Sequence, residues 1–282
     1  MKRQSRPFMI LGVLHLFLLI FTFFHKKQKT LVLLFSSIGI AYVFEYFVLN
    51  VFKMYTYYPK VFKNKWIDSV FGALLSQAVF VPIMGTFLAF FKFDEKWRIF
   101  ASLLFGGVEK IFIKWGIFKN LSWRTKYTII AMPYYFNIVN RWNKGLQDPN
   151  AKVMPAISLF FYYWVNYTNI YFFLLAISKQ FLFRIGFFKD KYWEHFILLP
   201  LYTFIQSAIG TASTKINKLN SILFGLFSLH MMDQLFFKLK IIKAKKWNPY
   251  TFFPVHAAMF LIGKYFNKLI LKYREDKNTL AK

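Results

Sequence analysis

The chain has 282 residues and no cysteine, which excludes disulfide bonds, thiolate metal sites and cysteine nucleophiles. Hydrophobic residues make up 57% of it, and a soluble domain would have no interior large enough for its 39 Phe and 8 Trp. The formal net charge of +27 is typical of nucleic-acid-binding proteins, but the Lys and Arg residues fall mostly between and at the ends of apolar runs. These positions suit contact with anionic lipid headgroups, so we predict a lipid bilayer as the partner and no nucleic acid.

Apolar runs of transmembrane length recur along the whole chain. Because backbone amides must be paired within each membrane span, the runs predict an all-α, polytopic transmembrane helical bundle. The first run follows a basic start, but it lacks a cleavage site and ends in His25-Lys26-Lys27, so we predict a retained span rather than a signal peptide. The fifth run is short and is interrupted by Pro133. The nine predicted spans cover residues 7–25, 30–52, 67–91, 97–118, 127–142, 153–178, 193–213, 219–240 and 249–270.

Two stretches of the chain, 105–123 and 229–247, align without a gap. The alignment places Glu109 on Asp233, Lys114 on Lys238 and Trp123 on Trp247. When shifts of one or a few residues are allowed, the alignment extends further and matches spans two to five with spans six to nine. This match predicts a tandem duplication. Since each repeat holds four spans, the repeats would be parallel. The predicted divisions are an extra N-terminal span over 1–29, a first repeat over 30–142, a linker over 143–152, a second repeat over 153–270 and a basic tail over 271–282.

Acidic residues inside the apolar spans are the strongest functional candidates. A charge at the bilayer centre costs roughly 2.5–3.5 kcal/mol or more, so such a residue faces protein or water and often marks an ion or proton pathway. Glu109 and Asp233 would be proton or cation sites, one in each repeat. Alternatively, each acid forms an ion pair with a neighbouring lysine that ties helices together. The lysine candidates are Lys110, Lys114 and Lys238.

Other polar residues within spans give weaker hypotheses. Glu45 is either a specialised site or one end of a structural hydrogen bond to a tyrosine, and Gln77 and Gln206 are candidates for lining a polar pathway. His230 and Asp233 share a helix face, and with His256 they would give three ligands for a metal-activated water. That intramembrane metalloenzyme is the least favoured alternative, because the chain has no HExxH, GxSxG or phosphate-binding loop motif. We predict no cofactor and no resident metal.

One family resemblance rests on short motifs. Tyr57-Tyr58-Pro59 precedes a basic, aromatic stretch, a span with a proline follows, and Glu109 is then followed by Trp123 and Tyr127-Thr128. In these features the chain resembles small, uncharacterised multi-pass membrane proteins of spore-forming Gram-positive bacteria, here as a tandem pair. The resemblance covers roughly residues 40–140 and, more weakly, 180–268. It implies a membrane location and a helical fold, and it carries no activity.

Two classes of function follow from these patterns. The first is transport of a small solute, ion or proton with the intramembrane acids in the pathway. The second is a non-catalytic scaffold, sensor or subunit with a membrane-protein partner or a second copy of the chain. Either function would be carried out in a bacterial cell membrane, and the distribution of Lys and Arg favours a cytoplasmic N-terminus.

Overall fold

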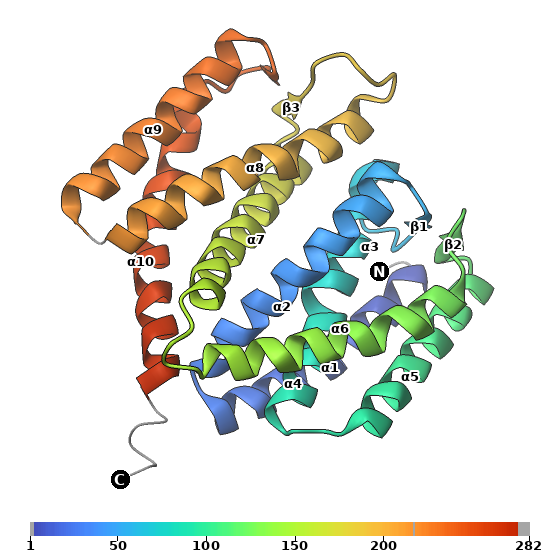
Figure 1. Ribbon diagram of the computed structural model, residues 1–282. Coiled ribbons are helices and arrows are strands. Elements are labelled where there is room, and N and C mark those ends of the chain that lie inside the picture. Colours follow the sequence, from blue (N-terminus) through green and yellow to red (C-terminus); the bar gives the residue numbers. More distant parts are fainter. Residues whose placement is uncertain (1–2, 217, 276–282) are drawn as a thin grey trace. The chain divides into compact units, whose positions relative to one another are not determined.

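The computed structural model describes residues 3–216 and 218–275 and is built almost entirely of helices, which confirms the predicted all-α class (Figure 1). The chain divides into two compact units, Met1–Ala151 and Lys152–Lys282. Each unit has its own buried core and is considered separately below.

The first unit contains six α-helices and one pair of short strands. Two π-helical turns interrupt it, Tyr46–Val51 at the end of α2 and Leu75–Phe80 between α3 and α4. Each π turn accommodates one extra residue in an otherwise α-helical segment. In chain order the elements are α1 (Arg6–Lys26), α2 (Lys29–Glu45), β1 (Tyr55–Tyr57), α3 (Lys65–Leu74), α4 (Val81–Phe90), α5 (Glu95–Lys114), β2 (Phe118–Asn120) and α6 (Thr125–Leu146).

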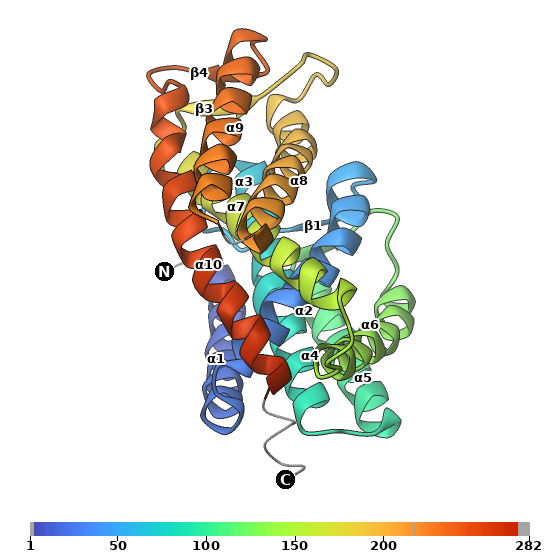
Figure 2. The ribbon, with the colours of Figure 1, turned by 60° about the vertical axis from the view of Figure 1, so that its left-hand side comes forward.

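The second unit contains four α-helices and a second pair of strands. A 3₁₀ turn over Pro249–Phe252 leads into its last helix, and Figure 2 shows that helix beside α9. The core is rich in aromatic rings, and its largest fully buried side chains include five tyrosines. In chain order the elements are α7 (Val153–Ser178), β3 (Phe181–Phe183), α8 (Lys191–Ile216), α9 (Leu219–Lys238), β4 (Ile242–Ala244) and α10 (Phe253–Glu275).

Both strand pairs are antiparallel and join segments far apart in sequence. Thr56 pairs with Lys119 in the first unit, and Leu182 pairs with Lys243 in the second. These strands were not predicted, because each has only three residues, which is too short for an alternating pattern to be recognised. The first pair joins the segment after α2 to the segment after α5, and the second joins the segments after α7 and α9.

Four helical segments are long and apolar enough to cross a membrane: Arg6–Lys26, Lys29–Val51, Lys65–Phe90 and Lys191–Ile216. The prediction of nine spans is therefore wrong in number, although within the described ranges nine helices form where those spans were expected, counting α3 and α4 as one. Charged residues lower the apolar character of α5, which contains Glu95, Lys96 and Arg98. The four apolar helices support a membrane location.

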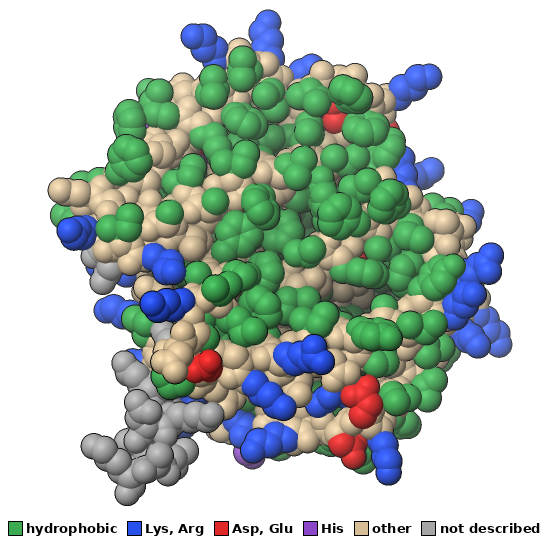
Figure 3. Space-filling view, in the orientation of Figure 1, with side chains coloured by type: hydrophobic (Ala, Val, Ile, Leu, Met, Phe, Trp, Pro, Cys, Tyr) green, Lys and Arg blue, Asp and Glu red, His purple; other side chains and the backbone are tan. Residues whose placement is uncertain are grey.

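The outer surfaces of several helices are apolar. On α1 most of the large hydrophobic side chains are exposed, and Phe17 and Phe24 are among them. In the second unit, hydrophobic side chains cover the face over α8 and α9 in Figure 3. Phe204 on α8 and Phe224 and Phe227 on α9 are exposed. Exposed apolar area of this extent is typical of surfaces that contact lipid or another protein.

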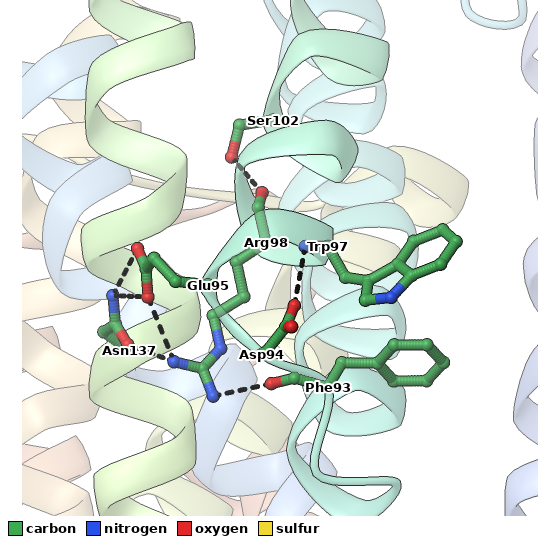
Figure 4. A network of polar contacts seen from close by, with 7 residues as sticks. All are labelled: Phe93, Asp94, Glu95, Trp97, Arg98, Ser102 and Asn137. Atoms are coloured by element: carbon green, nitrogen blue, oxygen red, sulfur yellow. Dashed lines mark hydrogen bonds and ion pairs between the residues drawn. The ribbon is translucent and has the colours of Figure 1, made fainter.

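A polar network fastens α5 to α6 (Figure 4). The Arg98 guanidinium donates to the carbonyl of Phe93 at 2.9 Å, to Glu95 at 3.2 Å and to the side-chain oxygen of Asn137 on α6. Asn137 in turn donates to Glu95 at 3.1 Å, and Asp94 caps the first turn of α5 by accepting from the Trp97 N–H. Glu95 and Arg98 therefore form an ion pair within α5, and the Asn137 amide on α6 bonds to both of them.

Adjacent glycines on α5 should respond to alanine with opposite sign. A Cβ on Gly106 would lie 2.6 Å from Ile129 of α6, whereas a Cβ on Gly107 would meet nothing within 4 Å. We expect Gly106→Ala to lower the free energy of unfolding by about 1–3 kcal/mol through overpacking. Gly107→Ala should raise it by about 0.5–1 kcal/mol because alanine is the better helix former. Unfolding in detergent measures both, and equal shifts would contradict the close α5–α6 packing.

Candidate functional site

A buried acid of the first unit, Glu45, contacts strand β1. It is the last residue of α2 and accepts a hydrogen bond from the Tyr55 hydroxyl. Burial raises the pKa of the Tyr55 phenol well above its ordinary value, and the Glu45 charge raises it further, so Tyr55 is a neutral donor. Gln77, from the π turn between α3 and α4, lies beside both groups.

Glu109 projects from α5 toward the start of α6 and is half-buried. Its carboxyl oxygens accept hydrogen bonds from the hydroxyls of Thr125, at 2.7 Å, and Thr128. The Trp123 indole donates to the same Thr128 hydroxyl at 2.9 Å. This arrangement fixes the position of Glu109 without a neighbouring cation.

The predicted ion pairs with lysine are wrong. In the described ranges, no ion pair joins Glu109 to Lys110 or Lys114, or Asp233 to Lys238. All three lysines are exposed, because residues one or five positions along a helix point away from the face that carries the acid.

A partly open cavity of about 930 Å³ lies within the first unit, lined by side chains from α1, α2, α4, α5, α6, both strands and both π turns. Most of the lining is aliphatic or aromatic, which is typical of pockets for small molecules. Among the described residues that line it, none is Lys or Arg. Its polar groups include His15, Tyr57, Ser76, Gln77, Glu109 and Thr128.

Asp233 lies in a closed network of the second unit. The carboxylate is fully buried, accepts from the Tyr202 hydroxyl on α8 and faces Nε2 of His256 on α10 at 2.8 Å. The other ring nitrogen of His256, Nδ1, lies 3.3 Å from the Tyr167 hydroxyl on α7. With Nε2–H donating to Asp233, Nδ1 is free to accept from Tyr167. Asp233 therefore links three helices of its unit.

The three side chains of the metal-site alternative, His230, Asp233 and His256, do not come together. His256 meets Asp233, but His230 interacts instead with Gln234 at 3.2 Å and with the Tyr250 ring. Over residues 3–216 and 218–275 no group of three or more His, Cys, Asp or Glu side chains is arranged to hold a metal ion.

The two glutamines that were candidates for a polar pathway lie in different surroundings. Gln77 lines the first-unit cavity, whereas Gln206 is buried in the second unit and donates to Tyr171 at 3.1 Å.

Several residues of these networks were missed by sequence reasoning. Thr125, Thr128 and Tyr202 satisfy Glu109 and Asp233 in place of lysines, whereas the tyrosine expected as a partner of Glu45 is Tyr55. The chain has 17 tyrosines, and no sequence pattern distinguishes Tyr55 and Tyr202 from the others. These two reach their acids only through tertiary packing. Thr125 and Thr128 could have been identified from the sequence, because they lie near the start of the helix that is predicted to follow Trp123.

No family model, curated protein or solved structure matches the chain at a significant level.

Proposed function

We propose that this protein is a multi-pass membrane protein that transports a small solute or ion, and that the first unit carries the binding cavity. The observation that supports this proposal best is the meeting of an acid, Glu109, an amide, Gln77, and apolar walls around one space of about 930 Å³. Glu45 adds a second acid directly behind the lining, through its bond to Tyr55. Intramembrane acids at a cavity are typical of ion and proton pathways.

We also infer that the two units arose by tandem duplication, as the sequence alignment predicts. Each has the order helix, strand, helix, helix, strand, helix, with α1 as an addition to the first. Left-handed backbone conformations supply further support, because they occur at positions that the alignment matches. These pairs are Lys53 with Lys179, Lys60 with Gly186, and Gly116 with Lys240.

Matching hydrogen bonds also support the duplication. The Tyr58 N–H donates to the Ile117 carbonyl, as the Arg184 N–H does to the Ile241 carbonyl at the aligned position. Aligned acids, Asp68 and Glu194, each accept from three backbone N–H groups of the preceding loop. The resemblance to small one-repeat proteins of the bacterial cell membrane fits this history and stays a proposal.

A scaffold role is the second candidate, and the second unit favours it. Both carboxyl oxygens of Asp233 are occupied by protein groups, so this acid is a tether between helices rather than an open site. The apolar faces of α8 and α9 would then contact lipid, a membrane-protein partner or a second copy of the chain.

Neutralising Glu109 tests the transport proposal. In proteoliposomes that report proton, Na⁺ and K⁺ flux, Glu109→Gln should reduce the parent's flux about tenfold or more. A tenfold reduction corresponds to a loss of about 1.4 kcal/mol of interaction free energy with the transported ion. Its thermal stability should stay near that of the parent, since glutamine still accepts from Thr125 or Thr128. The exposed neighbour Lys110 provides the control Lys110→Gln, which should transport normally. A parent protein without any of these fluxes would overturn the proposal in favour of the scaffold.

A further inference from the structure

We propose that the first-unit cavity binds a lipophilic cation, with its positive centre beside Glu109 and its apolar groups along the helix faces. The inference rests on the proposed function for the location of the site and adds the chemical class of its ligand. It follows from the aromatic rings around Glu109, the charge of the lining and a comparison with the second unit.

Aromatic rings gather at the acidic end of the cavity. Tyr55 lies 5.2 Å from Phe118 and 5.7 Å from Trp123, and Tyr57 lies 4.8 Å from Phe118, measured between ring centroids. All four rings line the cavity together with Glu109. Aromatic faces attract cations, and an aromatic cage beside a carboxylate is a common way to bind ammonium groups.

The charge of the lining excludes an anion and favours a cation. The chain has 38 Lys and Arg residues, yet none is among the described residues that line this cavity. Glu109 is the one acid among the described residues of the lining, and the Glu45 carboxyl lies behind Tyr55. Burying a negative ligand here would place like charges together in an apolar setting, which is strongly unfavourable.

One buried polar atom on the lining has no hydrogen-bond partner among the described residues. It is Nε2 of His15, a residue that is 8% exposed and bonds to the Leu11 carbonyl only through Nδ1. Buried polar atoms are normally satisfied, so an unpaired atom on a cavity wall indicates that the space is built to hold something.

The second unit shows what fills the corresponding space when no ligand is needed. Tyr202 packs 4.7 Å from Phe183 and 5.0 Å from Phe236 and donates to Asp233. In the alignment these four positions correspond to Ser76, Tyr57, Phe112 and Glu109, all of which line the first-unit cavity. The first unit thus has a serine at the position of the Tyr202 ring. The space that this ring would fill lies next to the Glu109 carboxylate. An aromatic or alkyl cation would occupy that space.

Binding of matched ions tests the inference. Tetraphenylphosphonium and tetraphenylborate have nearly the same shape and opposite charge, and equilibrium dialysis against the full chain in nanodiscs measures each, with empty nanodiscs subtracted. We expect saturable binding of the phosphonium and only lipid partitioning of the borate. Ser76→Tyr, which copies Tyr202, should weaken phosphonium binding about tenfold or more, or about 1.4 kcal/mol. The control Ser122→Tyr, at an exposed position, should bind normally.

A second variant keeps the test decisive if Ser76→Tyr does not fold. Glu109→Gln leaves the space open and should still weaken phosphonium binding about tenfold, or about 1.4 kcal/mol. Equal saturable binding of both ions, or no saturable binding of the phosphonium, overturns the inference. Proton or Na⁺ flux without phosphonium binding would overturn it while leaving transport in place. Phosphonium binding without any flux would support the cation site and overturn transport.

Discussion

Asp233→Ala should destabilise the protein by about 2–6 kcal/mol, because it leaves two buried donors without an acceptor and each such group costs about 1–3 kcal/mol. The variant leaves His256 Nε2 and the Tyr202 hydroxyl unpaired, and both residues are almost fully buried. It also leaves a void where α8, α9 and α10 meet. Denaturant or thermal unfolding in detergent measures the loss, and expression at the parent's level with an unchanged midpoint would contradict the network.

Conservative variants separate the charge of Asp233 from its hydrogen bonds. Asp233→Asn keeps an oxygen for the Tyr202 hydroxyl but presents an amide donor toward His256. We expect its loss of stability to fall between those of the parent and Asp233→Ala. If asparagine and alanine are equally destabilising, the carboxylate charge is what matters, and the hydrogen-bond account is wrong.

Glu194→Ala should cost at least about 3 kcal/mol, because hydrogen bonds to a charged acceptor contribute about 1.5–3 kcal/mol each and four are lost. The Glu194 carboxylate is fully buried. Its Oε1 accepts from the N–H groups of Ile185, Gly186 and Phe187 at 2.6–3.0 Å, and its Oε2 accepts from Arg184 at 3.1 Å. The loop between β3 and α8 therefore depends on one side chain. Faster amide hydrogen exchange confined to this loop, together with a lower unfolding midpoint, is the expected result.

Glu194→Gln and Asp190→Ala are the matched controls. Glutamine can keep its carbonyl oxygen toward the loop, so its effect should be smaller than that of alanine. Asp190 accepts from the N–H groups of Tyr192 and Trp193 at an exposed position, so its loss should cost about 1 kcal/mol, as for an ordinary helix cap. Protection of the loop in Glu194→Ala equal to that in the parent would refute this assignment.

The helices could be predicted from the sequence because long apolar runs between basic clusters determine them. The predicted run 153–178 has the same bounds as α7, and 219–240 differs from α9 only at its end. The prediction of a short fifth span was less accurate. Pro133 lies inside α6, which continues to Leu146. The missed last turn contains Asn143, Lys144 and Gly145, which a hydropathy argument assigns to a loop.

The acids were located correctly as buried or half-buried groups, but their partners were not. For Glu109 and Asp233, sequence distance suggested lysines on the same helix, whereas the observed partners lie on other elements, such as Thr125 on α6 and His256 on α10. For Glu45 a hydrogen bond to a tyrosine was expected, and Tyr55 on β1 provides it. Partners that are brought together by tertiary packing leave no periodic signal in one sequence. The cavity could not be predicted for the same reason, since it depends on which side chains fail to fill a space.

The π turn over Leu75–Phe80 lies where the alignment of the two units slips by one residue. An extra residue in a regular α-helix would rotate everything after it by about 100° around the helix axis, whereas a π turn takes up the extra residue locally. The helix after the turn therefore keeps its inward-facing side chains inward. Over their described lengths α7 and α8 have no such turn. The polar residues Ser76 and Gln77 lie within the turn and line the cavity, so a local insertion can change a cavity wall without repacking the rest of the helix.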